Sequence, residues 1–378
     1  MANNIPMVDL HGQYLKIKTD IDAALQQVID SCAFIGGPAV NTFTSHLSDY
    51  LGGNRVITCA NGTDALQLAL MALDLHPGDE VIVPAFTYVA SAEVIALLGL
   101  TPVLVDVDPA TFNVSIPSVA DAITPRTRAV IPVHLFGQSC DMEPLLNLAA
   151  EHHLYVVEDN AQAIGAEYTF GDGHRAKTGT MGTIGCTSFF PSKNLGCYGD
   201  GGALCTSDES LAERIRMIAN HGQRVKYHHD VIGCNSRLDA MQAAILDVKL
   251  CHLDEYNTAR QTAAHYYTAA LREVDGLRVP TVSGNTTHVF HQYTLRVLGG
   301  RRDSLKAFLA ERGIPSMIYY PLPLHHQEAF RDICRLGGDL TSSEQLAGEV
   351  LSLPMHTELT TDQQDRIIDA IVDFFKKK

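Results

Sequence analysis

The chain has 378 residues, 46% of them hydrophobic, which is enough to bury a large core and leads us to expect two domains. Its 28 basic and 43 acidic side chains give a net charge of −15, so general binding to nucleic acid or to an anionic membrane is not expected. Any anionic ligand must be met by a local site.

Short apolar runs alternate with helical patterns from Arg55 to about Ser207. The strand-like runs are VITC (56–59), VIVPA (81–85), PVLVDV (102–107), AVIPVH (129–134), LYVVED (154–159), TSFF (187–190) and GALCT (202–206). Helical patterns such as TDALQLALMAL, AEVIALLGL and LLNLAAEHH lie between them. This alternation predicts an α/β domain built on a mainly parallel sheet.

The alternation stops after a helical segment at 209–222, and long helical patterns then cover about 236–275. The last third mixes strands with helices, namely YTLRV (293–297), SLKAFLAERG (304–313), MIYYP (317–321) and QQDRIIDAIVDFF (363–375). We therefore predict a large domain over residues 1–250 and a smaller α+β domain over 251–378.

Polar motifs follow two of the expected strands. NGTDAL (61–66) opens a helix, where Gly62 lets the backbone approach a ligand and Thr63 can cap the helix and offer its hydroxyl. Free N–H groups at such a helix start favour a phosphate. Asp159 ends the strand LYVVED, and Gln162 follows three residues later. Ordinary helix capping explains NGTDAL better than ligand binding does. For Asp159, helix capping and ligand binding are equally good explanations.

A lysine lies in a glycine-rich loop, SFFPSKNLGCYGDGGA (188–203), between two expected strands. Glycine permits tight turns, so such a loop can present Lys193 as a reactive group, with Ser188 five residues before it. A lone lysine would ordinarily be solvated. Tyr88, just after VIVPA, is either an aromatic that stacks on a ligand or a core residue.

These residues together match the needs of pyridoxal phosphate (PLP). That cofactor requires an amine to form an imine, a carboxylate to keep its pyridine nitrogen protonated, donors for its phosphate and groups that sandwich its ring. Open α/β sheets bind ligands at the carboxyl ends of their strands, where these candidates lie. The sequence therefore predicts a PLP site around Lys193 and Asp159.

In this order the motifs resemble the DegT/DnrJ/EryC1/StrS family of sugar aminotransferases over almost the whole chain. The matching segments are VDLHGQY, FIGGPAVNTF, CANGTDALQLAL, GDEVIVPAFTYVASAEVI, PVLVDVDPATFNV, PVHLFGQ, VVEDNAQAIGA, SFFPSKNLGCYGDGGA, HGQRVKYHHDVIGCNSRLDAMQAAIL and YYPLPLHHQEAF. The resemblance implies a fold-type-I PLP aminotransferase, with a mainly parallel seven-stranded sheet in the large domain and a smaller C-terminal α+β domain. It also implies a homodimer whose active sites lie between the subunits.

The resemblance also assigns roles to single residues. Lys193 matches the catalytic lysine that forms the imine, and Asp159 matches the partner of the pyridine nitrogen. The other implied cofactor contacts are Gly62, Thr63 and Ser188 at the phosphate, Gln162 at the phenolic oxygen, Tyr88 on the ring and Asn235 reaching the phosphate from the partner subunit. Relatives with histidine in place of this lysine dehydrate sugars, so Lys193 indicates amination. Asn160 departs from the usual small residue and receives no role.

The substrate is expected to be a nucleotide-linked keto sugar, with L-glutamate as amino donor. The lysine loop and GCNSRLDAMQAAIL most resemble enzymes that aminate UDP-2-acetamido-2-deoxy-3-oxo-glucuronate for surface polysaccharide (O-antigen) synthesis. The alternatives are a dTDP-3-keto-6-deoxyhexose 3-aminotransferase and a non-catalytic sugar-nucleotide sensor. A uronate needs a cationic or donating partner, and the resemblance places segments holding Arg224, Arg237 and His325 near the substrate.

Other features predict a cytoplasmic protein without a metal. The nine cysteines are scattered and form no Cys-x-x-Cys, so neither a disulfide framework nor a thiolate zinc site is expected. No secretory signal or membrane-spanning apolar stretch is found. The histidine pairs at 152–153, 228–229 and 325–326 lack a His-Glu-x-x-His spacing, so we expect no metal ligands among them.

Overall fold

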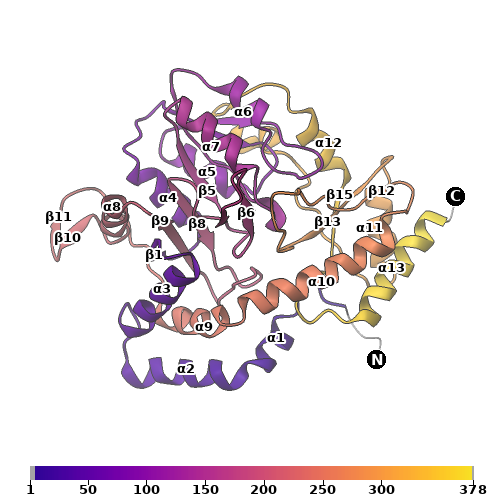
Figure 1. Cartoon of the computed structure of the whole chain (residues 1–378), viewed down its shortest axis with the longest axis horizontal. Helices are drawn as coiled ribbons and strands as arrows, with labels where there is room; N and C mark the ends of the chain where they lie inside the picture. Colours follow the sequence, from indigo (N-terminus) through magenta and orange to yellow (C-terminus); the bar gives the residue numbers. More distant parts are fainter. Residues whose placement is uncertain (1–4, 377–378) are drawn as a thin grey trace.

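The computed structural model describes residues 5–376 and is built around one large sheet with helices on both faces (Figure 1). In spatial order its strands are β1 (Arg55–Cys59), β9 (Gly202–Thr206), β8 (Ile184–Ser188), β5 (Tyr155–Asp159), β4 (Thr127–Val130), β2 (Glu80–Pro84), β3 (Thr101–Val105) and β14 (Arg335–Leu336). Within this sheet β9 alone runs opposite to the direction that the other strands share. The expected α/β fold with a mainly parallel sheet is confirmed.

The sheet has one strand more than the seven expected. The additional strand, β14, comes from the last third of the chain and pairs in parallel with β3, with Arg335 opposite Val103. β14 contains only Arg335 and Leu336, which is too short to form an apolar run, so the sequence pattern did not predict it. A segment of the predicted small domain therefore completes the edge of the large sheet.

Residues of the central strands pack alternately into two different cores, because successive side chains of a strand point to opposite faces of the sheet. Val81 and Val83 pack on one face, while Ile82 packs on the other. The first face is covered by α4 (Gly62–Ala72), α5 (Ala90–Leu97) and α8 (Glu209–Ala219). The second face is covered by α6 (Ile116–Ala122) and α7 (Met142–Glu151) at one end and by α3 (Pro38–Tyr50) and α9 (Ala240–Leu250) at the other.

A second apolar core lies in the C-terminal part of the chain. Its strands and helices are β12 (Leu277–Arg278), β13 (Tyr293–Val297), β15 (Val350–Leu353), α10 (Leu253–Leu271), α11 (Arg302–Ala310) and α13 (Thr361–Lys376). The predicted strand YTLRV is confirmed as β13, whereas MIYYP is not a strand and forms only an isolated bridge between Met317 and Ser352. A domain boundary near residue 250 stays a prediction.

The remaining elements lie around these two cores. They are α1 (Leu10–Lys16), α2 (Lys18–Ser31), the hairpin of β6 (Glu167–Thr169) and β7 (Arg175–Lys177), the hairpin of β10 (Gln223–Val225) and β11 (His228–His229), α12 (Thr341–Glu349), and the short helices η1 (Leu135–Gly137), η2 (Leu324–His326) and η3 (Glu328–Phe330). The turn of the first hairpin, residues 170–174, joins β6 to β7. In residues 5–376, no helix combines the length and apolarity required to cross a membrane.

A buried carboxylate joins β14 to the middle of the sheet. The Glu80 side chain is fully buried and accepts hydrogen bonds from Thr124 (2.7 Å), Arg126 (2.7 Å) and Arg335 (3.1 Å). Burial alone would raise the pKa of Glu80, but these hydrogen bonds outweigh it and hold the pKa below its ordinary value. Arg335 also donates to the Ala122 carbonyl oxygen at 2.6 Å, so one guanidinium fixes β14 to two elements.

Candidate active site

A cavity of about 670 Å³ opens where β1, β2, β5 and β8 reach their carboxyl ends. Its volume lies in the usual range for small-molecule sites, and its place is the one that open α/β sheets use for ligands. Seven of the predicted site residues line it, namely Gly62, Thr63, Tyr88, Asp159, Gln162, Ser188 and Lys193. Residues distant in the sequence therefore meet at one site because their strands run in the same direction.

The Lys193 amine is buried and is a weaker base than an ordinary lysine. Lys193 follows β8 in the loop to β9, and its backbone N–H donates to the Phe190 carbonyl oxygen at 2.8 Å. Burial lowers the pKa of Lys193 to about 8, although the nearby carboxylate of Asp159 acts in the opposite direction. A minor but substantial fraction of this amine is therefore neutral near physiological pH, and the neutral form is the one that attacks an aldehyde.

Asp159 ends β5 and is held rigidly at the bottom of the cavity. Its side chain is 5% exposed and accepts from the Ser91 hydroxyl at 2.8 Å and from the Ala161 backbone N–H at 3.1 Å. The chain after Asp159 forms a turn and no helix, so the helix-capping alternative for this residue is wrong. A fixed, buried carboxylate of this kind can stabilise a protonated pyridine nitrogen.

The start of α4 packs directly against the end of β8. A Cβ atom added to Gly62 would lie 2.6 Å from the Ser188 Cβ, so this contact requires glycine. Asn61, and not Thr63, caps the helix, since its side chain accepts from the Asp64 N–H at 2.8 Å. Thr63 lies inside the first turn, where its hydroxyl stays available to a ligand because another residue performs the capping. The helix N-terminus and the Ser188 hydroxyl form a cradle suited to a phosphate.

Aromatic and amide groups form another wall of the cavity. Tyr88 is 56% exposed and lies 6.1 Å from the Tyr320 ring, centroid to centroid, so the alternative that Tyr88 is a core residue is wrong. Gln162 accepts from the Phe136 N–H at 2.8 Å and donates to the Tyr320 hydroxyl at 3.1 Å. Its orientation is thereby fixed toward Tyr320.

Four predicted residues do not line this cavity: Asn235, Arg224, Arg237 and His325. Asn235 and Arg237 are exposed in the segment before α9, and the exposed Arg224 lies on β10. The β10–β11 hairpin projects from the body of the molecule in Figure 1. These side chains lie outside the cavity of their own chain, and their roles stay predictions.

The sequence did not single out several residues that line the cavity, among them His291 and Tyr320. Burial, and then the positive charges of Lys193 and Arg260, hold the pKa of His291 well below its usual value, so this ring is neutral. Arg260 is buried on α10 and donates to the carbonyl oxygen of His291 at 3.4 Å. No motif marks His291, because it reaches the cavity from the C-terminal part of the chain. Tyr320 could have been suspected from the YYP motif in a segment already matched to the family.

The residues present fit pyridoxal phosphate. The cradle formed by the start of α4 and the Ser188 hydroxyl suits its phosphate. The buried Asp159 suits its pyridine nitrogen, and the weakly basic Lys193 amine suits its aldehyde. Asn160, which received no role, donates to the Thr178 carbonyl oxygen at 3.1 Å and so supports the loop behind the site. The cavity therefore contains groups for the three polar functions of the cofactor.

The fold and the cavity define the class of this protein as a pyridoxal-phosphate-dependent aminotransferase. The chain belongs to the DegT/DnrJ/EryC1/StrS aminotransferase family, whose pattern it matches over residues 15–372. The family predicted from the motifs is therefore confirmed, and so is the cofactor.

Three curated relatives share more than two-fifths of their residues with the chain. A "Pleiotropic regulatory protein" of Geobacillus stearothermophilus is 47% identical over 99% of both chains. The UDP-2-acetamido-2-deoxy-3-oxo-D-glucuronate aminotransferase of Pseudomonas aeruginosa is 46% identical over 94% of this chain and 96% of its own. The dTDP-3-amino-3,4,6-trideoxy-alpha-D-glucose transaminase of Streptomyces venezuelae is 42% identical over 99% of this chain and 97% of its own.

A solved structure agrees with the fold. The crystal structure of S. venezuelae DesV in complex with a ketimine intermediate superposes with a TM-score of 0.94 and 41% identity, over 99% of each chain. Agreement over the full length of both chains extends to the C-terminal region that supplies Tyr320 and His291.

Proposed function

We propose that this protein transfers an amino group from L-glutamate to the 3-keto carbon of a UDP-linked keto sugar acid, UDP-2-acetamido-2-deoxy-3-oxo-glucuronate. The observation that carries the aminotransferase chemistry is the shared cavity of Lys193 and Asp159, in which the amine has a pKa of about 8. Support for the uronate comes from the relative of P. aeruginosa and from the lysine loop.

Each residue of the cavity has a defined task in this proposal. Bound PLP supplies an electron sink that makes the α-hydrogen of an amino acid acidic. The Lys193 amine holds the cofactor between turnovers and, once released, moves a proton to and from the reacting carbon. Asp159 keeps a positive charge on the pyridine nitrogen. Gly62, Thr63 and Ser188 bind the phosphate, so the ring stays in place while Lys193 is displaced.

The substrate argument rests on charge. The proposed substrate carries a diphosphate and a carboxylate, whereas the protein has a net charge of −15. Binding then depends on a few positioned donors and cations. We assign this task to Arg224, Arg237 and His325, with Arg224 and Arg237 acting across a subunit interface because both are exposed outside their own cavity.

The same argument leads us to propose a homodimer with shared active sites. Asn235 would reach the cofactor phosphate of the partner subunit, consistent with its exposed position in the segment before α9. We further propose a cytoplasmic enzyme that serves surface polysaccharide (O-antigen) synthesis, where nucleotide-linked sugars are consumed.

A second candidate is a dTDP-3-keto-6-deoxyhexose 3-aminotransferase, which the S. venezuelae relative favours. The regulatory name of the Geobacillus relative favours a third reading, a sugar-nucleotide sensor without catalysis. A sensor does not need an amine of lowered pKa beside a buried carboxylate, and this cavity has both. We therefore rank the sensor below either enzyme.

The deciding experiment offers the purified protein, loaded with PLP, a panel of UDP- and dTDP-linked 3-keto sugars together with glutamate. Mass spectrometry reports the aminated sugar, and a coupled assay reports 2-oxoglutarate. The uronate proposal requires the UDP-linked acid to have the highest kcat/KM. Faster amination of a dTDP-6-deoxy sugar would replace it with the second candidate, and no amination of any member would favour the sensor.

A further inference from the structure

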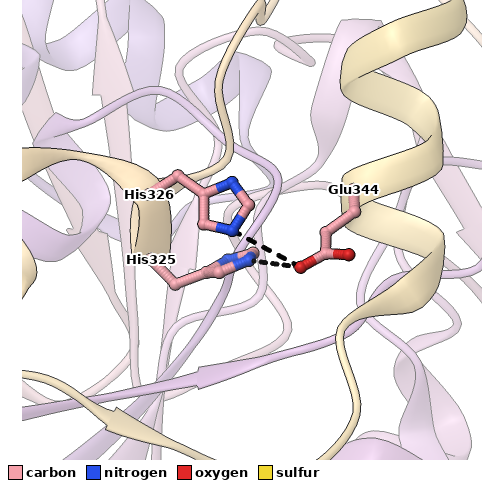
Figure 2. Close-up of side chains that lie close together, drawn as sticks. All are labelled: His325, His326 and Glu344. Atoms are coloured by element: carbon pink, nitrogen blue, oxygen red, sulfur yellow. Dashed lines mark hydrogen bonds and ion pairs between the residues drawn. The ribbon is translucent and has the colours of Figure 1, made fainter.

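Two adjacent histidines and a glutamate converge outside the cavity. His325 and His326 lie on η2, and Glu344 lies on α12. Figure 2 shows both imidazole rings turned toward the same carboxylate. The Nε2 atom of His325 lies 3.2 Å from Oε1 of Glu344, and the Nε2 atom of His326 lies 3.4 Å from the same oxygen. Two ring nitrogens therefore share one carboxylate oxygen.

These separations also match the spacing of two ligands on one metal ion. The His325 contact is a long hydrogen bond at 3.2 Å, and the His326 contact is longer than most N–H···O bonds. Two ligand atoms bound to tetrahedral zinc at about 2.0–2.1 Å lie about 3.3 Å apart. Both nitrogen–oxygen distances are close to that value, and the three ligand atoms lie within 4.8 Å of one another. Bringing the two imidazole nitrogens to the same spacing would complete three ligand positions around one ion.

Burial supplies a second, independent observation. The His325 side chain is only 7% exposed, and its Nδ1 atom has no hydrogen-bond partner within residues 5–376. This unpaired atom is not the one that faces Glu344, so Nε2 is the nitrogen of His325 that can reach an ion beside the carboxylate. The His326 and Glu344 side chains are 48% and 52% exposed, so the fourth ligand position faces water.

We propose that His325, His326 and Glu344 bind one divalent first-row metal ion, with Zn²⁺ the best match and water as the fourth ligand. Two imidazole nitrogens and one carboxylate oxygen form a ligand set that zinc uses, and Co²⁺ or Ni²⁺ would also fit it. The expectation that the histidine pairs hold no metal rested on local spacing, and the third ligand comes from another helix.

The ion would join two segments beside the candidate active site. The backbone N–H of Leu324 on η2 donates to the carbonyl oxygen of Ala85 at 2.9 Å, just beyond β2. The chain that leads into η2 contains Tyr319 and Tyr320, which line the cavity. A metal bridge from η2 to α12 would therefore fix the segment that follows this part of the cavity wall.

Metal titration of the full-length protein tests the proposal. The protein, loaded with PLP and freed of metal by chelation, is titrated with Zn²⁺ by calorimetry and with Co²⁺ by visible absorption. We expect one site per chain with a nitrogen and oxygen Co²⁺ spectrum. A thiolate band would instead indicate binding to the exposed Cys32 or Cys251. Glu344→Gln and His326→Ala should each weaken the affinity at least about tenfold.

The matched control is His46→Gln. His46 is exposed to a similar extent and lies 2.7 Å from Asp247, but in the described part of the chain this pair belongs to no group of three ligands. Its removal should leave the metal affinity within twofold of the wild type. Zinc should also raise the midpoint of thermal unfolding in the wild type and in His46→Gln, but not in Glu344→Gln.

Crystals soaked in zinc give the final readout. An anomalous peak between His325, His326 and Glu344 supports the site. Zinc found only at cysteines, or Glu344→Gln and His326→Ala that both bind like the wild type, would overturn it. None of these measurements depends on the sugar substrate, so the metal site and the aminotransferase function are tested separately. A metal bound by His325 would take this residue away from the uronate carboxylate and leave Arg224 and Arg237 for that task.

Discussion

The carboxylate of Asp159 raises the proton affinity of the Lys193 amine, while burial of that amine lowers it further than the carboxylate can restore. The result is a pKa of about 8 in place of 10.5. Asp159 ends β5, and Lys193 lies in the loop that follows the adjacent parallel strand β8, so the two side chains meet at the same edge of the sheet. Burial at this edge, opposed by the carboxylate, sets the reactivity of the lysine.

Replacing Lys193 by alanine should remove both turnover and the yellow colour of the bound cofactor, because one amine binds the cofactor covalently and moves the proton. Rates should fall by on the order of 10⁴-fold or more, beyond a typical single acid–base effect. Absorption spectra and single-turnover assays measure this. Lys306→Ala on α11, away from the cavity, is the control. Retained turnover in Lys193→Ala would refute its assignment.

Asp159→Asn should shift the pH dependence of cofactor capture. The neutral Lys193 amine reacts, so the rate at which the apoprotein takes up PLP should rise with pH, with its midpoint near the amine pKa of about 8. Because the carboxylate raises the amine pKa, its removal should move the midpoint to lower pH. Turnover should fall by on the order of 10²-fold. Stopped-flow absorbance across pH reports the midpoint, and an unchanged midpoint together with normal turnover would contradict the role of Asp159.

Gly62→Ala should weaken PLP binding by about tenfold or more, equivalent to about 1.4 kcal/mol. The new methyl group would lie 2.6 Å from the Ser188 Cβ, so the start of α4 must move away from the phosphate cradle. Equilibrium dialysis of PLP measures the effect. Gly348→Ala on α12 meets no atom within 4 Å and serves as the control. Equal affinity in both variants would show that the phosphate binds elsewhere.

Mixing two inactive variants should restore activity if the active sites are shared between subunits. A hybrid of Lys193→Ala and Asn235→Ala subunits contains one site with both residues intact, so up to about a quarter of wild-type activity is expected for random exchange. Mass-labelled subunits verify the exchange. The test requires that Asn235→Ala alone be strongly impaired, and the absence of rescue after proven exchange would count against a shared site.

Arg237→Ala, Arg224→Ala or His325→Ala should reduce the preference for a uronate. Losing a group that pairs with a desolvated carboxylate typically costs about 2–5 kcal/mol. At least one variant should therefore lose most of the discrimination between the acid and the same sugar with an uncharged C6. The ratio of kcat/KM values for the two sugars measures this discrimination. Three unchanged ratios would argue that other groups bind the carboxylate.

The cofactor side of the cavity could be predicted from sequence because each residue is tied to the end of a strand with a clear apolar pattern. Asp159 and Ser188 are the last residues of β5 and β8, so parallel pairing brings them together. The predicted cap of α4 was Thr63, whereas Asn61, two residues earlier, caps the helix. Both residue types are good caps, and only the backbone geometry selects between them.

Long-range contacts without a local pattern could not be predicted. Glu344 belongs to an ordinary amphipathic helix, and nothing in its neighbourhood points to His325 and His326. His291 follows a buried segment of the C-terminal core and reaches the cavity only through the fold. In both cases the contact depends on how the C-terminal part packs against the large sheet.

The pairing of β14 with β3 limits how this chain can be divided. A fragment ending near residue 250 would lack Arg335, so the buried Glu80 carboxylate would lose a guanidinium partner. It would also expose the backbone edge of β3, a hydrophobic strand whose free N–H and C=O groups invite pairing with other chains. The N-terminal part should therefore aggregate when produced alone, although it holds Lys193 and Asp159.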